Sequence, residues 1–360
     1  MSQAGIRLEA VSVGFGRFSL QNIDLTVDEG ERLVLIGQNG AGKSVTLETI
    51  AGFHRLKSGR ITIGGRDVTH LPPERRNVGF MLQNFGLFPH LSVAGNIGLG
   101  LHGRQRGAQA REQIARLLRE FGIEHLATRH PQSLSPGEKQ RAGLARARAA
   151  AAALFMFDEP FSALDAETHA RLRHDLRDFL DENGSPAILV THDWRDAHAW
   201  GTKLAILRDG AVVQTGKVDA MFRAPNSRFV AAMLGVENIL PARLTGMTDG
   251  WAIIEIGGIA LRAALPVGGL TGPNLLAAIR AEDLDIIPPG GHAPPDTNRL
   301  TAQVASIVSE GVLTRVDLQC GCPLQARIMS RLARNMNALP GIMLDIAITP
   351  DAIRLLPDEP

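Results

Sequence analysis

The stretch Gly37–Ser44 reads Gly-Gln-Asn-Gly-Ala-Gly-Lys-Ser, which is the spacing of a phosphate-binding loop, Gly-x-x-x-x-Gly-Lys-Ser/Thr. Glycines let such a loop curl around an anion, because they lack the Cβ that clashes at positive φ. We expect Lys43 to reach the β- and γ-phosphates of a nucleotide and the Ser44 hydroxyl to ligate Mg²⁺. The predicted nucleotide-binding residues of this loop are Gly37, Gln38, Asn39, Gly40, Ala41, Gly42, Lys43 and Ser44.

Two other apolar runs also end in side chains that could act on a phosphate. Leu154–Phe157 is followed directly by Asp158 and Glu159, and Ala187–Val190 is followed by Thr191 and His192. Asp158 would hold Mg²⁺, often through water, and Glu159 would polarise the attacking water. His192 could reach a γ-phosphate. The alternatives are two solvated acids in a turn and a structural histidine.

Strands and a helix must position these groups. Leu33–Ile36 reads as a buried parallel strand before the loop, and Val45–Ala51 reads as the start of a helix after it. Val78–Leu82 is a further short strand, ending at Gln83. Parallel α/β sheets bind ligands at the carboxyl ends of their strands. The pattern therefore predicts that the loop, Asp158, Glu159 and His192 share one edge of an α/β sheet.

A helix start is predicted at Ser135. Ser135 is an N-cap candidate, Pro136 suits the first helical position, and Glu138 stands where a capping box has its Glu or Gln. The alanine-rich helix that follows is expected to run to about Ala152. Upstream, residues 6–27 read as antiparallel strands. Either Phe15 or Phe18 in this region could stack on a purine, or both could belong to the core.

Composition limits the classes of function. The 360 residues are 44% hydrophobic with a formal net charge of +1, so no field suited to nucleic acid is indicated. We see no signal peptide, and the longest apolar run, Ala149–Phe157, is too short to span a bilayer. We therefore expect a cytosolic protein that meets a membrane only through a partner. Cys320 and Cys322 exclude a disulfide framework and read as small residues near a turn.

The pattern changes near residue 235. Residues 1–235 hold 29 basic and 24 acidic side chains, whereas residues 236–360 hold 9 and 13. The sequence therefore predicts two domains, 1–235 and 236–360. The second reads as short strands and glycine turns with two weak repeats, about 239–288 and 299–357, joined by a proline-rich linker. Two small β-barrels of similar build are the simplest interpretation.

With these motifs in order, residues 1–235 resemble the ATP-binding subunit of ATP-binding-cassette (ABC) transporters. The resemblance implies a P-loop NTPase cassette with a RecA-like core, an antiparallel β subdomain and a helical signature subdomain. The matching positions are Gly37–Ser44 as Walker A, Gln83 as the Q-loop, Ser135–Glu138 as the signature, Leu154–Glu159 as Walker B, Ser162–Asp165 as the D-loop, His192 as the switch histidine and Phe15 as the aromatic residue on adenine.

The resemblance also implies cofactors and partners. ATP and Mg²⁺ would bind, with Gln83 joining Ser44 and Asp158 near the metal and Glu159, His192 and Gln83 acting in hydrolysis. Two cassettes would form a head-to-tail homodimer, with Ser135 and Gly137 of one covering the ATP of the other. The dimer would sit on two integral-membrane permease subunits at the cytoplasmic face of the inner membrane. A periplasmic or extracellular solute-binding protein would act indirectly, and no nucleic acid is implied.

Residues 236–360 resemble the transport-associated oligonucleotide-binding-like (TOBE) domain of importer ATPases, an all-β fold. Leu324–Ile328 is similar to its molybdate-binding variant, and Ser330 and Arg331 are the nearest side-chain donors for an oxyanion. We therefore expect an importer for molybdate or tungstate, with sulfate, ferric iron or polyamine as alternatives. A soluble ABC ATPase of DNA repair or translation, and an exporter, are further alternatives. Pro136 departs from the family's Leu-Ser-Gly-Gly-Gln signature, and it has no N–H to donate to a phosphate.

Overall fold

The computed structural model describes residues 4–16, 18–82, 85–101, 106–161, 166–265, 269, 272–288 and 291–358. The chain forms two compact units, Met1–Met221 and Phe222–Pro360. They divide before the boundary expected near residue 235. The reason is local packing: Ala231 and Val236 bury their side chains against Leu276, Ala278 and Leu356 of the second unit.

The first unit is built on a six-stranded sheet in the order β10-β9-β3-β8-β7-β6. The strands from β9 to β6 in this order are all parallel to one another. The remaining strand, β10, pairs antiparallel with β9. Apolar residues fill β3, β7 and β8 because both faces of the sheet are covered. The strands are β3 (Arg32–Gly37), β6 (Val78–Met81), β7 (Leu154–Asp158), β8 (Ala187–Thr191), β9 (Lys203–Arg208) and β10 (Ala211–Lys217).

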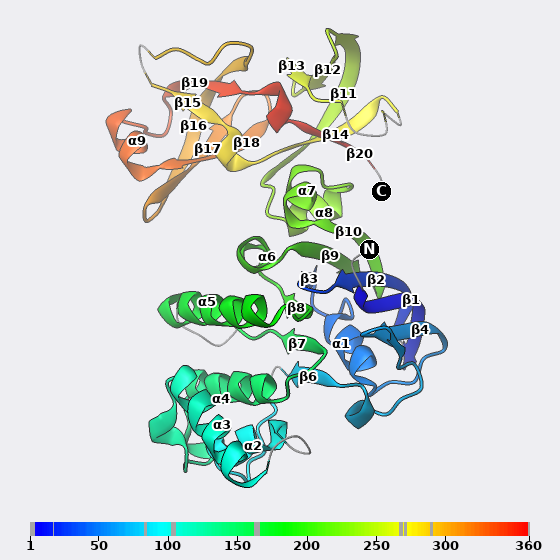
Figure 1. The fold of residues 1–360 in the computed structure, drawn as a ribbon. Coiled ribbons are helices and arrows are strands. Elements are labelled where there is room, and N and C mark those ends of the chain that lie inside the picture. Colours follow the sequence, from blue (N-terminus) through cyan, green and yellow to red (C-terminus); the bar gives the residue numbers. More distant parts are fainter. Residues whose placement is uncertain are drawn as a thin grey trace. The chain divides into compact units, whose positions relative to one another are not determined.

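Helices cover this sheet on both sides. Figure 1 shows α1 (Lys43–Ala51) on one side of β3, β8 and β7, and α5 (Ala166–Asn183) and α6 (Trp194–Trp200) on the other. A second, antiparallel sheet in the order β2-β1-β4-β5 shares a core with α1 and the central strands. Its strands are β1 (Ala4–Phe15), β2 (Phe18–Asp28), β4 (Ser58–Ile63) and β5 (Arg66–Asp67). The predicted α/β organisation is confirmed.

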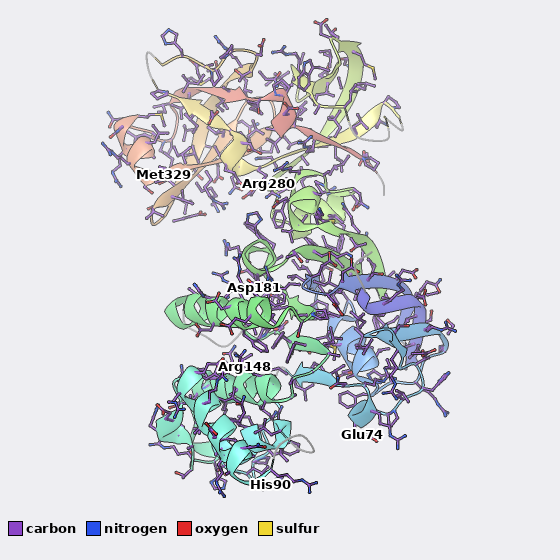
Figure 2. All side chains as sticks on the ribbon, viewed as in Figure 1. Glu74, His90, Arg148, Asp181, Arg280 and Met329 are labelled. Carbon is purple, nitrogen blue, oxygen red and sulfur yellow. The ribbon has the colours of Figure 1, made fainter. Side chains whose placement is uncertain are left out.

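Three helices, α2 (Val93–Gly100), α3 (Gly107–Glu120) and α4 (Pro136–Ala149), form their own apolar cluster beyond β6. Arg148 of α4 connects this group to α5 (Figure 2). Its guanidinium lies 2.8 Å from a Glu120 carboxylate oxygen and 4.5 Å from the centre of the Phe179 ring. No helix among the described residues is long and apolar enough to cross a membrane.

The second unit contains two five-stranded antiparallel sheets with orders β13-β12-β11-β14-β20 and β18-β17-β16-β19-β15. Its elements are α7 (Val218–Arg223, begun in the first unit), α8 (Arg228–Met233), β11 (Asn238–Thr248), β12 (Trp251–Ile256), β13 (Ile259–Ala263), β14 (Asn274–Ile279), β15 (Asp285–Ile287), β16 (Asn298–Glu310), β17 (Leu313–Gln319), β18 (Pro323–Met329), α9 (Ser330–Asn335), β19 (Met343–Ile348) and β20 (Arg354–Pro357).

The two repeats exchange their last strands. β15 ends the first repeat but pairs with β19 of the second, and β20 ends the second repeat but pairs with β14 of the first. One hydrophobic core takes residues from both sheets, for example Ile254 and Ile346. The structure therefore differs from two separate small barrels, because neither sheet is complete without a strand from the other repeat.

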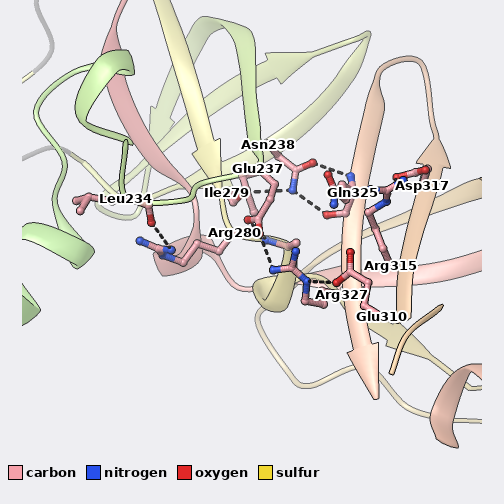
Figure 3. Close-up of polar contacts among 11 residues, drawn as sticks. Leu234, Glu237, Asn238, Ile279, Arg280, Glu310, Arg315, Asp317, Gln325 and Arg327 are labelled. Atoms are coloured by element: carbon pink, nitrogen blue, oxygen red, sulfur yellow. Dashed lines mark hydrogen bonds and ion pairs between the residues drawn. The ribbon is translucent and has the colours of Figure 1, made fainter. Parts of the chain in front are cut away.

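The hydrogen bonds of two buried asparagines also link the two repeats. Asn238 at the start of β11 donates to the carbonyls of Ile279 and Gln325, and its Oδ1 accepts from the Gln325 N–H at 2.6 Å (Figure 3). Asn298 at the start of β16 does the same with Ile348 and Arg262, accepting from the Arg262 N–H at 2.7 Å. Each asparagine thus ties its own repeat to the third strand of the other.

Candidate active site

The carboxyl ends of the parallel strands lie at one edge of the sheet. In the ladder Asp158 pairs with Val190, Thr191 with Ile36, and Gly37 with Leu207. The phosphate loop leaves β3 at this edge. The neighbouring strands β7 and β8 end there in Asp158–Glu159 and Thr191–His192, respectively. The structure therefore brings together four groups that the sequence had placed at strand ends.

The loop requires glycine where it turns into α1. Gly42 is the N-cap residue at φ 103°, and a Cβ there would come within 2.6 Å of the Phe18 ring and 2.8 Å of Leu20. A Cβ on Gly37 would lie 2.5 Å from the Leu207 carbonyl oxygen. Gly210, in the turn between β9 and β10, donates its N–H to the Ala41 carbonyl at 3.0 Å. Neighbouring strands therefore hold the loop in shape.

Lys43 lies within this loop. Its Nζ donates to the carbonyl oxygens of Gly37 at 2.8 Å and Gln38 at 3.1 Å, and the side chain is buried. Burial lowers the pKa of Lys43, while the carboxylates of Glu159 and Asp158 act to raise it. The ammonium is therefore hydrogen-bonded to the loop backbone and close enough to the acids at the end of β7 to interact with their charges.

Asp158 is buried at the end of β7. Burial raises the pKa of its carboxyl above the usual range, and a hydrogen bond from Ser44 acts in the opposite direction. Ser44 and Asp158 are therefore in contact. A hydroxyl beside one carboxylate suits Mg²⁺, which in nucleotide sites takes few protein ligands and completes its shell with water and phosphate oxygens. The donor set fits this ion. Among the described residues no cluster of three His, Cys, Asp or Glu side chains could hold a metal by itself.

Glu159 and His192 face each other across the strand ends. The His192 Nδ1 lies 3.5 Å from a Glu159 carboxylate oxygen. Glu159 has φ 48°, an unusual value for a residue with a side chain, and is mostly buried, whereas 62% of the His192 side chain is exposed. A carboxylate and an imidazole held this close can act on one water molecule and the phosphate it attacks.

The predicted helix start at Ser135 is confirmed. The Ser135 hydroxyl accepts from the Glu138 N–H at 3.4 Å, and the Glu138 carboxylate accepts from the Ser135 N–H at 2.7 Å. Pro136 occupies the first helical position, where no intrahelical bond needs its missing N–H. Hydrogen bonds from the Ser135 backbone and side chain lower the pKa of the Glu138 carboxyl.

Some predicted site residues are not joined to this edge within one chain. No hydrogen bond or ion pair of the described residues links Ser135 or Gly137 to the phosphate loop. Gln83 and Ser162–Asp165 lie outside the described residues, and so does the side chain of Phe15. The Phe15 backbone pairs with Phe18 at the hairpin between β1 and β2.

Ser330 does not offer a free donor, contrary to its expected place beside an oxyanion. It is buried, and its hydroxyl accepts from Thr314 at 2.9 Å and donates to the Gly311 carbonyl at 2.8 Å. These bonds hold the start of α9 against the turn between β16 and β17. The serine stabilises the fold, and the neighbouring Arg331 is the exposed residue of the pair.

Sequence reasoning missed Asp196 and Arg146. Asp196 on α6 is 3% exposed and binds the hydroxyl of Thr191, the residue before His192. Arg146 on α4 donates to the carbonyls of Phe85 and Gly86, just beyond Gln83. For Asp196 a signal was present, since it stands between the apolar run of β8 and the apolar Ala197 on a short helix.

Comparison with known proteins identifies the family to which the first unit is similar. A family profile described as "ABC transporter" matches residues 20–162. A dimeric ATP-binding cassette in a post-hydrolysis state with ADP and phosphate superposes with a TM-score of 0.55 at 28% identity, covering 59% of this chain and 98% of that one. The likeness to this structure therefore falls on part of the chain, while the relatives below extend further.

Relatives match almost the whole chain. A putative 2-aminoethylphosphonate import ATP-binding protein of Salmonella paratyphi A is 35% identical over 344 residues, 94% of this chain and 91% of the relative. A molybdate/tungstate import ATP-binding protein of Pyrococcus horikoshii is 37% identical over 320 residues, 88% and 89% of the two chains. A sulfate/thiosulfate import ATP-binding protein of Chromobacterium violaceum is 32% identical over 359 residues, 98% and 96%.

Proposed function

Because this chain belongs to the ATP-binding subunits of ABC importers, which couple ATP hydrolysis to transport, we propose that it drives uptake of a tetrahedral oxyanion. Molybdate or tungstate is the first candidate cargo, and sulfate or thiosulfate the second. The observation that carries this choice is chemical: phosphonate, molybdate, tungstate, sulfate and thiosulfate, named for the three relatives, all have a tetrahedral centre with oxygen ligands.

The first step in our proposal is nucleotide binding. The N–H groups of Gly37–Ser44 and the N-terminus of α1 would face the phosphates, because an α-helix carries partial positive charge there. On binding, the Lys43 ammonium would exchange its two carbonyl acceptors for phosphate oxygens. Phe15 would stack on the adenine. The positive charge of Lys43 would then be paired with phosphate oxygens.

For hydrolysis we assign Glu159 to accept a proton from the attacking water and His192 to contact the γ-phosphate. Ser44, Asp158 and Gln83 would hold Mg²⁺, which supplies positive charge beside the phosphates. The short distance between Glu159 and His192 supports these roles, since both groups must act on one small reaction centre.

The assembly we propose is a homodimer of cassettes. Among the described residues, no hydrogen bond or ion pair joins Ser135 or Gly137 to the phosphate loop of their own chain, which fits a role on the nucleotide of the partner copy. The dimeric cassette with a similar fold supports this arrangement. Two permease subunits would hold the dimer at the cytoplasmic face of the membrane, and a solute-binding protein would deliver cargo to them.

The proposed partners and cargo can be tested on a single preparation of the protein. The tagged full-length chain is isolated from detergent-solubilised membranes, and its integral-membrane partners are identified. The complex is then reconstituted in vesicles, with ATP supplied on the side of the membrane where the cassette lies. Uptake of molybdate, tungstate, sulfate and 2-aminoethylphosphonate is measured beside ferric iron and spermidine. Uptake of an oxyanion supports the proposal. Uptake of iron or polyamine without any oxyanion would refute it, and failure to recover any membrane subunit would favour a soluble ATPase.

A further inference from the structure

A buried carboxylate lies directly behind the turn that carries His192. Asp196 on α6 is 3% exposed. Its Oδ2 accepts from the Thr191 hydroxyl at 3.1 Å, and its Oδ1 lies 2.8 Å from the His169 Nε2 and 3.3 Å from the Arg173 guanidinium. A buried carboxylate is retained only where its partners compensate the loss of water. Both oxygens of Asp196 therefore have fixed partners on two other elements.

Thr191 fastens both ends of the turn. Its hydroxyl donates to Asp196 and accepts from the Asp193 N–H at 3.1 Å. The Asp193 carboxylate in turn caps α6 by accepting from the Arg195 N–H at 2.8 Å. His192 stands between these two anchored residues. Its side chain is mostly exposed, so the backbone of this turn fixes the point from which the imidazole extends.

His169 connects the same carboxylate to the segment that follows Glu159. Its ring lies on α5 and stacks on Phe161, with centroids 4.9 Å apart and planes 18° apart. Phe161 is buried and stands two residues after Glu159. The contacts thus run from Glu159 along the chain to Phe161, then to His169, Asp196 and Thr191, and return to His192. His192 lies 3.5 Å from Glu159, so these contacts form a closed series, which we call the circuit.

We propose that Thr191, Asp196 and His169 are positioning residues for hydrolysis, which set the relative placement of the Glu159 carboxylate and the His192 imidazole. This rests on the roles proposed above for those two groups. Positioning matters because a displacement of about 1 Å at a reaction centre can lower a rate about 100-fold. The three residues do not touch the phosphate loop in any described hydrogen bond, so the effect falls on turnover and not on nucleotide affinity.

Thr191 provides the sharpest test, because Thr191→Val keeps the shape of the side chain and removes only its hydroxyl. In the full-length protein we expect kcat to fall about tenfold or more, with the KM and the Kd for ATP changed less than about twofold. Thr191→Ser keeps the hydroxyl and should restore kcat to within about threefold of wild type. An unchanged kcat in Thr191→Val, or equal losses in the valine and serine variants, would overturn the proposal.

Two substitutions of His169 separate hydrogen bonding from stacking. His169→Gln retains an N–H donor toward Asp196, whereas His169→Phe retains an aromatic ring against Phe161. We expect the phenylalanine variant to lose about tenfold in kcat and the glutamine variant to lose less. The reverse order would show that the hydrogen bond does not position the site. This pair also decides the matter if Thr191→Val does not fold.

A histidine elsewhere on α5 supplies the control. His174 Nδ1 lies 2.8 Å from an Asp178 carboxylate oxygen on the solvent side of the helix, with 73% of its side chain exposed. His174→Gln and His174→Phe repeat the same chemical changes away from the circuit and should leave kcat at the wild-type value. Losses there equal to those at His169 would indicate a general effect on α5 and would contradict the proposal.

Glu159→Gln distinguishes failure of this inference from failure of the proposed function. If that variant hydrolyses ATP at the wild-type rate, the role proposed for Glu159 is wrong. The positioning inference then fails with it, because it rests on that role. If Glu159→Gln stops hydrolysis while Thr191→Val and His169→Phe both keep the wild-type kcat, the proposed function stands and only the positioning inference fails.

Discussion

The sheet edge of the first unit and the junction of the two repeats in the second unit use buried polar groups in opposite ways. At the sheet edge of the first unit, Lys43 and Asp158 are buried with their pKa values displaced by that burial, and Glu159 adopts a positive φ. In the second unit, the amides of Asn238 and Asn298 are fully engaged with backbone partners. Strained and displaced groups are typical of reactive sites, and satisfied groups are typical of structural ones.

This difference indicates what each unit can contribute. In our proposal, the first unit holds charged groups, such as Lys43, that exchange their partners when a phosphate binds. In the second unit, the buried amides of the two asparagines join the two repeats. Ser330 likewise has a structural role, since its hydroxyl bonds Thr314 and Gly311. Substitutions should therefore alter rate in the first unit and stability in the second.

The largest effect is expected at Glu159. Glu159→Gln removes the proposed proton acceptor and should lower steady-state ATP hydrolysis by about 10²–10⁴-fold while leaving the Kd for ATP close to wild type. Phosphate release and nucleotide binding are measured on the same preparation. Glu112→Gln on the exposed side of α3 is the matched control and should change neither quantity. Near-normal turnover in Glu159→Gln would remove the proposed catalytic difference between the units.

The next effect is on stability and tests the symmetry of the second unit. Asn238→Ala and Asn298→Ala each remove three hydrogen bonds and leave buried backbone groups without partners, which costs about 1–3 kcal/mol. We expect similar losses for the two variants in urea unfolding of the full-length chain, with the Kd for ATP unchanged.

Asn274→Ala at the exposed start of β14 serves as their control and should be nearly neutral. A change in ATP affinity without a change in unfolding would show that these amides belong to a functional site.

A smaller effect is expected at the start of α4. Pro136→Gly should change hydrolysis less than about tenfold, because the proline occupies a position whose N–H has no intrahelical partner. Ser135→Ala should cost more, since it removes a cap worth about 1 kcal/mol together with the proposed contact to the partner's ATP. Both rates are compared with wild type at saturating ATP. A hundredfold gain in Pro136→Gly would mean that the proline impairs this site.

The smallest effect concerns a cysteine pair of the second unit, in which one thiol has a displaced pKa. A hydrogen bond from Cys322 lowers the pKa of the Cys320 thiol to about 7, whereas the pKa of Cys322 is raised. The thiolate of Cys320 therefore accumulates as pH rises through about 7, and alkylation by iodoacetamide should follow that midpoint.

Cys322→Ser retains a hydroxyl donor and should keep the midpoint of Cys320, whereas Cys322→Ala should move it toward the ordinary thiol value of about 8.5. Equal midpoints in the serine and alanine variants would contradict this cause. Mass spectrometry of the alkylated peptide assigns the reacting sulfur in each case.

Much of the candidate site could be predicted because its signals are local. The glycine spacing of Gly37–Ser44, the acids after Leu154–Phe157 and the capping box at Ser135 each depend on residues close together in the chain. Periodicity and flanking residues were sufficient to place them on strand ends and at a helix start, and the parallel topology then joined the strand ends at one edge.

The sequence by itself thus determined the backbone geometry of the phosphate loop and the side chains at the strand ends, because both depend on neighbouring residues. Only the tertiary structure decided which distant groups support them. Phe18 and Leu20 make Gly42 obligatory, Asp196 reaches His169 on another helix, and β15 and β20 exchange between repeats. Such contacts depend on how whole elements pack, and a side chain's own neighbours in the chain carry no signal of its partner across the fold.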